Sequence, residues 1–156
     1  MLSTLAIGCT ASSLFRQYEY EEDVYLSLDG TATVYVNASL AALNALRGTA
    51  FDASSAGRVD TGAVRAYYTS AVTQVRRVSS FRRNNRRFVS VRMDVDDIRR
   101  LGSAAPFAWS AYRFDQQDHQ FVYRQTIGPA GGTGRGIAAW NGREMVAFRL
   151  HLPSKI

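Results

Sequence analysis

Three stretches of the sequence alternate apolar and polar residues on both sides of a short turn signal. The first stretch, residues 18–38, turns at Asp29-Gly30. Its regularly spaced apolar positions are Val24, Leu26, Leu28, Ala32, Val34 and Val36. Alternation with a period of two is typical of a β-strand with one buried face, and Asp-Gly favours a tight turn. We therefore expect an antiparallel hairpin, and this pattern constrains the fold more than any other feature of the chain.

The same alternation recurs further along the chain. Residues 72–95 predict a second hairpin that turns at Asn84-Asn85, and residues 107–128 predict a third whose tip lies near Gln117-Asp118. Asparagine favours such turns because it tolerates a positive φ. The return strand of the second hairpin is expected to bury Val89, Val91, Met93 and Val95. A final strand within residues 144–152 is expected to point Val146, Phe148, Leu150 and Leu152 inward.

Helix signals lie between the hairpins. Ser39 is a typical N-cap for a helix over residues 40–47, and Gly48 is expected to end it. Residues 61–71 predict a second helix, capped by Asp60 or Thr61. Residues 94–102 predict a short third helix, capped by Asp94 and closed by Gly102, with acidic residues near its start and arginines near its end.

This order of elements predicts an α+β fold: an antiparallel sheet built from hairpins, with two or three helices packed on one face. The strand-helix-hairpin-helix-strand portion is compatible with a ferredoxin-like split arrangement. The chain of 156 residues has the size of one domain, which we expect to span residues 18–156. Because the sequence stops soon after a strongly alternating strand, we expect this domain to be incomplete at its C-terminus.

A net charge of +6 favours anionic partners. The densest basic segment is the second hairpin, where phenylalanines flank the turn. We predict an anionic-surface site there, formed by Arg76, Arg77, Arg82, Arg83, Arg86, Arg87 and Arg92. Arginines beside aromatic rings could track the phosphates of single-stranded nucleic acid, or could meet anionic lipid headgroups or envelope polymers. They could also form only a solvated hairpin tip that discourages edge pairing.

Motifs for catalysis and for cofactors are missing from the sequence. His119 and His151 belong to different predicted elements, and neither lies near a nucleophile in a recognisable motif. The acidic clusters lack the spacing and the glycine of a divalent-cation loop, and the glycine-rich segment 128–142 lacks the spacing of a phosphate-binding loop. We expect no enzyme, no bound metal and no cofactor.

The single cysteine, Cys9, cannot form an intrachain disulfide. The preceding residues give the sequence Leu-Ala-Ile-Gly-Cys, which resembles a bacterial lipobox, in which the cysteine is acylated and becomes the mature N-terminus. Residues 1–17 are then a truncated signal and a polar tether. The alternative is a free thiol in a frayed N-terminal segment. A multiply acylated cysteine would hold the domain at a membrane face.

The chain is similar to the LppM-type domain of bacterial lipoproteins in four features taken together. These are the lipobox-like cysteine, the first hairpin followed by a leucine-rich helix, the second hairpin, and the helix over residues 94–102. Residue by residue, Cys9, Asp29 and Gly30 match that family. The resemblance implies a membrane-anchored, extracytoplasmic module of the cell envelope that is not an enzyme and binds lipids or proteins. The alternative function is a cytoplasmic nucleic-acid-binding module that uses residues 76–92, although we expect nucleic acid to be the less favoured partner.

Overall fold

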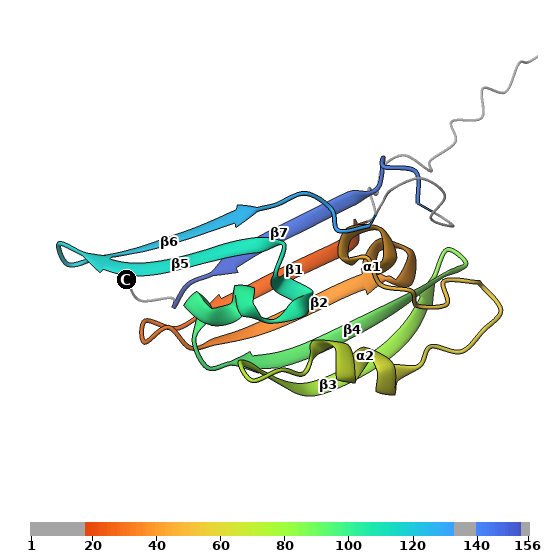
Figure 1. Cartoon of the computed structure of the whole chain (residues 1–156), viewed down its shortest axis with the longest axis horizontal. Helices are drawn as coiled ribbons and strands as arrows, with labels where there is room; N and C mark the ends of the chain where they lie inside the picture. The colour runs from red at the N-terminus through yellow and green to blue at the C-terminus, as the bar shows by residue number, and fades with distance from the viewer. Residues whose placement is uncertain (1–17, 133–139, 154–156) are drawn as a thin grey trace, which may run out of the picture.

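A computed structural model describes residues 18–132 and 140–153 of the chain, and these residues form the α+β fold that the sequence predicts (Figure 1). Cys9, the tether and part of the glycine-rich segment lie outside the described residues. The main sheet has five strands in the order β3-β4-β2-β1-β7. These strands are β1 (Tyr18–Leu26), β2 (Ala32–Ser39), β3 (Thr73–Arg83), β4 (Arg86–Val95) and β7 (Met145–His151).

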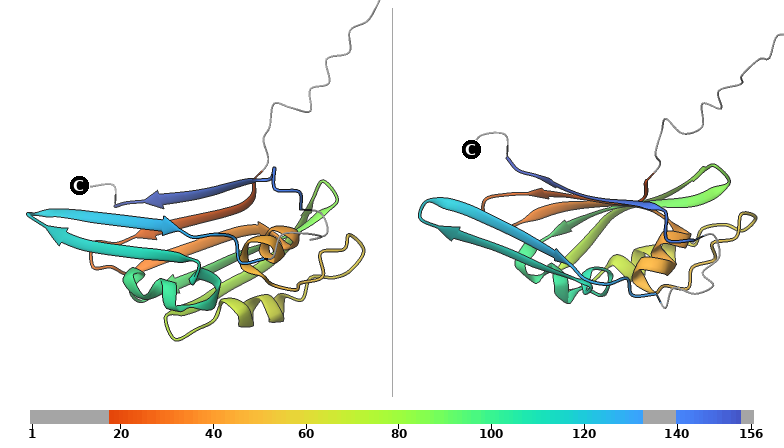
Figure 2. Two further views of the ribbon diagram at one scale, coloured as in Figure 1. Left: turned by 45° about the horizontal axis from the view of Figure 1, so that its top comes forward. Right: turned by 90° about the horizontal axis from the view of Figure 1, so that it is seen from above.

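The remaining elements lie on one face of this sheet, which we call the inner face (Figures 1 and 2). They are α1 (Leu40–Arg47), α2 (Thr61–Tyr68), the short 3₁₀ helices η2 (Ile98–Ser103) and η3 (Ala105–Phe107), and a hairpin of β5 (Ser110–Gln117) and β6 (Gln120–Ile127). β5 and β6 pair only with each other and form a separate two-stranded sheet. No helix in the described part of the chain covers the opposite face, which we call the outer face.

The predicted turns and caps of the first two helices and hairpins are confirmed. The Ser39 side chain accepts a hydrogen bond from the backbone N–H of Ala42 (3.0 Å), and Gly48 ends α1 with a φ of 66°. Asp60, one of the two predicted caps, starts α2. Asn84 and Asn85 have φ angles of 48° and 60°, as a tight turn between two strands requires.

One predicted cap is wrong. Asp94 belongs to β4, where its carboxylate pairs with Arg76, and Asp97 caps η2 by accepting a hydrogen bond from the backbone N–H of Arg99 (3.0 Å). The strand continues through Asp94 because Val95 is still an inward-facing position paired with Ala32 and Thr73. Burial of Val95 thus favours an extended backbone where helix-capping rules alone predicted a helix start.

The sheet departs from simple antiparallel hairpins at β7 and within β3. β7 pairs in parallel with β1, so the last strand joins the sheet beside the first. In β3, a bulge adds Arg76 between Val75 and Arg77. A regular strand would put Val75 and Val78 on opposite faces, because they are three positions apart in the sequence. The bulge lets both valines face the core and leaves Arg76 and Arg77 on the outer side.

The core lies between the inner face and the elements that cover it. The predicted inward residues Val89, Val91, Met93 and Val95 of β4 are all buried. Leu43 of α1, Val64 of α2 and Ile98 of η2 complete the core from the other layer. The last strand is covered less well, since Val146 and Leu150 of β7 are 41% and 37% exposed, although Phe148 packs against the core.

A candidate ligand-binding cleft

An apolar cleft of about 460 Å³ lies between the β5–β6 hairpin and the ends of β1 and β7. β5 and β6 form no β-ladder with the main sheet, so the distance between the hairpin and the sheet depends on the side chains packed between them. The residues that line the cleft are Leu26, Ser27, Leu28, Phe114, His119, Gln120, Phe121, Tyr123, Leu150, Leu152 and Pro153.

The cleft gathers exposed apolar side chains that a folded domain would ordinarily cover. Leu28, Phe121, Leu150 and Leu152 are each between 37% and 49% exposed. Phe121 stacks on Phe114 of the neighbouring strand, with ring centroids 5.6 Å apart and planes 13° apart, so the wall formed by the hairpin is ordered. Clustered, exposed apolar surface of this kind marks binding sites more often than isolated exposed residues do.

One wall of the cleft connects with a polar network inside the protein. Tyr123 lines the cleft, and its hydroxyl donates a hydrogen bond to Oε1 of Gln125 (3.0 Å). The Gln125 amide in turn donates to Oε1 of Glu22 (2.9 Å). The cleft therefore combines apolar walls with a chain of hydrogen bonds that leads to a buried carboxylate.

Glu22 lies in the middle of β1, and its side chain is buried on the inner face of the sheet. Its carboxylate accepts hydrogen bonds from the hydroxyls of Tyr20 (2.9 Å) and Tyr112 (3.1 Å) in addition to that from Gln125. Burial raises the pKa of Glu22, and the nearby Arg47 guanidinium and these hydrogen bonds oppose the rise. The same burial raises the pKa values of Tyr20 and Tyr112.

Arg47, in the last turn of α1, supplies the opposite charge. Its side chain is only 1% exposed, and its Nη2 lies 3.7 Å from Oε2 of Glu22. The guanidinium stacks between two rings, with Cζ 3.4 Å from the centroid of Trp109 and 4.3 Å from that of Tyr20. Among the described residues, none of its three nitrogens has a hydrogen-bond partner. In this part of the chain, the two rings and Glu22 hold Arg47 in a setting where charges interact strongly.

The predicted anionic-surface arginines do not form one surface. Arg82 and Arg87 turn toward the loop after α1, where Arg87 is buried and pairs with Asp52 (3.2 Å). The other five arginines lie on the opposite side of the β3–β4 hairpin. Two of these five are paired, Arg76 with Asp94 (2.6 Å) and Arg86 with Glu19 (3.1 Å).

The two histidines lie apart. His119 lines the cleft at the tip of the β5–β6 hairpin, whereas His151 lies on the outer face, where it contacts Asp23 (2.8 Å) and stacks on Tyr25. Within residues 18–132 and 140–153, no group of three His, Cys, Asp or Glu side chains is placed to hold a metal ion. None of the described helices has the length and apolarity needed to cross a bilayer.

Sequence reasoning missed Glu22 and Arg47, although one signal was present. Glu22 occupies the same alternating register as Tyr20, Val24 and Leu26, all of which face the core. A carboxylate at a core position requires a partner. Nothing in the sequence identifies that partner as Arg47, because the pairing depends on how α1 packs against β1.

No family model matches the sequence, and no curated protein matches it.

The charged pair generates a test by mutation. Changing Glu22→Gln leaves the Arg47 charge buried without a counter-charge, and Arg47→Met does the same to the Glu22 carboxylate. We expect each single substitution to lower the free energy of unfolding by about 3–5 kcal/mol. The double variant E22Q/R47M should lose much less stability than the two single variants lose together, because neither charge is then buried without its partner. Urea unfolding of the four proteins measures this coupling, and additive losses would show that the two charges do not stabilise each other.

Proposed function

We propose that this chain is a membrane-tethered, extracytoplasmic binding module of a bacterial envelope, similar to LppM-type domains, and that its cleft accommodates the hydrocarbon chain of a lipid. The observation that carries the proposal is the open cleft with its apolar walls. The proposed role is binding rather than catalysis.

The form of the cleft supports an extended apolar ligand. Its volume of about 460 Å³ lies in the range of small-molecule sites, and its walls come from the β5–β6 hairpin and the main sheet, which share no β-ladder. The tip of the hairpin, beyond the hydrogen bonds that tie Tyr112 and Gln125 to Glu22, can thus move relative to the sheet without breaking a β-ladder. A hydrocarbon chain would cover Leu28, Phe121 and Leu150, and about 25 cal/mol is gained for each Å² of apolar surface that binding removes from water.

The proposed anchor and the cleft belong to opposite ends of the sheet. The proposed tether joins β1 at Tyr18, whereas the cleft is formed at the other end of β1, around Leu26 and Leu28. The nine residues of β1 separate these ends by about 30 Å. A domain held at its tethered end therefore presents the cleft away from its point of attachment, where it can take up or release a lipid.

The finer description of the fold is also a proposal. Helices on one face of a mainly antiparallel sheet support a ferredoxin-like split arrangement of the central strands and helices. Nucleic-acid binding by residues 76–92 receives less support, because their arginines are divided between two sides of the hairpin and several are paired with carboxylates.

The cleft is tested by a matched pair of variants. Phe121 and Phe81 are 44% and 41% exposed, and each stacks on a second phenylalanine, but only Phe121 lines the cleft. We expect Phe121→Asp to weaken binding of a fluorescent long-chain acyl probe at least about tenfold, since it places a charge against the hydrocarbon. Phe81→Asp should bind the probe as the wild type does. Equal binding by all three proteins, measured by fluorescence anisotropy, would contradict a lipid site in the cleft.

The anchor is tested separately. In protein isolated from its native membranes, mass spectrometry should find Cys9 as the N-terminal residue carrying acyl groups. A Cys9→Ser variant should leave the membrane fraction, because the acyl chains supply the apolar attachment. An unmodified Cys9 in a protein that starts at Met1 would refute the anchor while leaving the test of the cleft intact.

A further inference from the structure

The β3–β4 hairpin places arginines directly opposite one another. Its register pairs Arg77 with Arg92, Arg82 with Arg87, and Arg83 with Arg86. Side chains opposite each other across an antiparallel ladder have Cβ atoms about 5 Å apart, so like charges at these positions destabilise the sheet unless other groups compensate them.

The protein compensates the pair of Arg82 and Arg87. Arg87 contacts the carboxylate of Asp52 (3.2 Å) and donates a hydrogen bond to the backbone carbonyl of the same residue (2.7 Å). Arg82 donates to the backbone carbonyl of Ser55. Both guanidinium groups are therefore tied to the loop that follows α1.

The pair of Arg83 and Arg86 is compensated in a similar way. Arg83 donates to the backbone carbonyl of Tyr18 (2.5 Å) and lies over the ring of Phe88. Arg86 pairs with the carboxylates of Glu19 (3.1 Å) and Glu144 (3.8 Å).

The pair of Arg77 and Arg92 has no such compensation. Both side chains are exposed on the outer face, and neither forms an ion pair or a hydrogen bond with any described residue. The ring of Tyr35 lies 5.8 Å from Cζ of Arg92. The neighbouring carboxylate of Asp94 is already bound to Arg76 (2.6 Å), so it does not neutralise them.

Several positions around this pair offer uncharged hydrogen-bond donors. Tyr35 of β2 is in register with Arg92. In the next outward-facing row along the strands, Ser90 is in register with Ser79 on one side and with Asn37 on the other. Hydroxyl and amide donors next to two guanidinium groups form a surface suited to an oxyanion.

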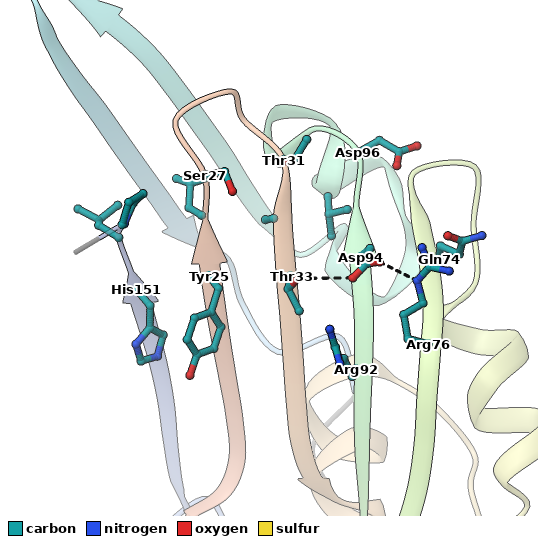
Figure 3. A pocket seen from close by; sticks show the side chains of 15 residues that line it. Tyr25, Ser27, Thr31, Thr33, Gln74, Arg76, Arg92, Asp94, Asp96 and His151 are labelled. Carbon is teal, nitrogen blue, oxygen red and sulfur yellow. Dashed lines mark hydrogen bonds and ion pairs between the residues drawn. The ribbon is translucent and has the colours of Figure 1, made fainter. Parts of the chain in front are cut away.

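A polar groove of about 720 Å³ leads up to Arg92 (Figure 3). Figure 3 shows the Arg92 side chain at the side of β4 that faces β2, with the hydrogen-bonded group of Thr33, Asp94 and Arg76 beside it. The bulge at Arg76 helps to create this arrangement, because it puts Arg76 where it can bind Asp94 and leaves Arg77 free opposite Arg92.

We propose that the outer face binds a phosphate group between Arg77 and Arg92. A phosphate carries the negative charge that the pair lacks, and its oxygens can accept hydrogen bonds from both guanidinium groups and from the nearby hydroxyls. The site is independent of the apolar cleft, which lies on the inner side of the sheet. The phosphate can belong to a lipid headgroup or be free in solution, and the chemistry of recognition is the same.

The chain offers a matched control. Arg113 and Arg124 also face each other across a ladder, in the β5–β6 hairpin. Their neighbouring row consists of Ala111 and Thr126, and Asp115 follows Arg113 on the same face of β5. The variants R77Q/R92Q and R113Q/R124Q therefore remove equal charge, but only the first removes the proposed site.

The experiment is a titration with inorganic phosphate at constant ionic strength, followed by amide NMR shifts, together with sedimentation of vesicles of phosphatidylglycerol or phosphatidylcholine. We expect saturable shifts around Arg77 and Arg92 in the wild type and in R113Q/R124Q, and affinity at least about tenfold weaker in R77Q/R92Q. Circular dichroism confirms that each variant is folded.

The vesicle arm identifies the source of the phosphate. Binding to phosphatidylglycerol vesicles that R77Q/R92Q loses and R113Q/R124Q keeps supports a lipid headgroup. Saturable binding of inorganic phosphate without vesicle binding supports a soluble phosphate. The absence of saturable binding in both arms would overturn the proposal. Equal losses in the two double variants would also overturn it, since they would reveal only the effect of net charge.

Discussion

The buried pair of Glu22 and Arg47 is the constraint on which the rest of the structure depends. Glu22 belongs to β1 and Arg47 to α1. The groups that contact them are Trp109, just before β5, Tyr112 of β5 and Gln125 of β6, so one polar cluster joins both layers of the fold. Burying two charges is unfavourable unless they are paired and surrounded by suitable groups. Because β5 and β6 share no ladder with the main sheet, the hydrogen bonds from Tyr112 and Gln125 to Glu22 help to fix the hairpin against it.

The cleft follows from this arrangement. The polar cluster holds one part of the β5–β6 hairpin close to the sheet. The hairpin tip around His119 and Gln120, which lies beyond this cluster, lines the cleft. Apolar side chains of β7 and of the β1–β2 turn are left half-exposed as a result. The inner side of the sheet thus provides an apolar site and the outer side a basic one, and we propose distinct ligand chemistries for the two.

Local patterns predicted most of the elements, because strand alternation and helix caps depend on neighbours in sequence. The turn at Asn84-Asn85 and the cap at Ser39 are examples. The parallel pairing of β7, the bulge at Arg76 and the partner of Glu22 depend on contacts between distant segments, which a single sequence does not specify. For the same reason, the dense run of arginines predicted one basic surface, whereas strand geometry divides it between two sides and pairs several members with carboxylates.

The most direct test of the central claim locates a lipid chain within the protein. NMR spectra of methyl-labelled protein with a bound long-chain acyl ligand should show intermolecular nuclear Overhauser effects from the chain to Leu28, Leu150 and Leu152, which line the cleft. They should show none to Val64, a core residue of α2 that does not line the cleft. Contacts confined to residues outside the cleft, or an acyl ligand that produces no contacts at all, would contradict the account.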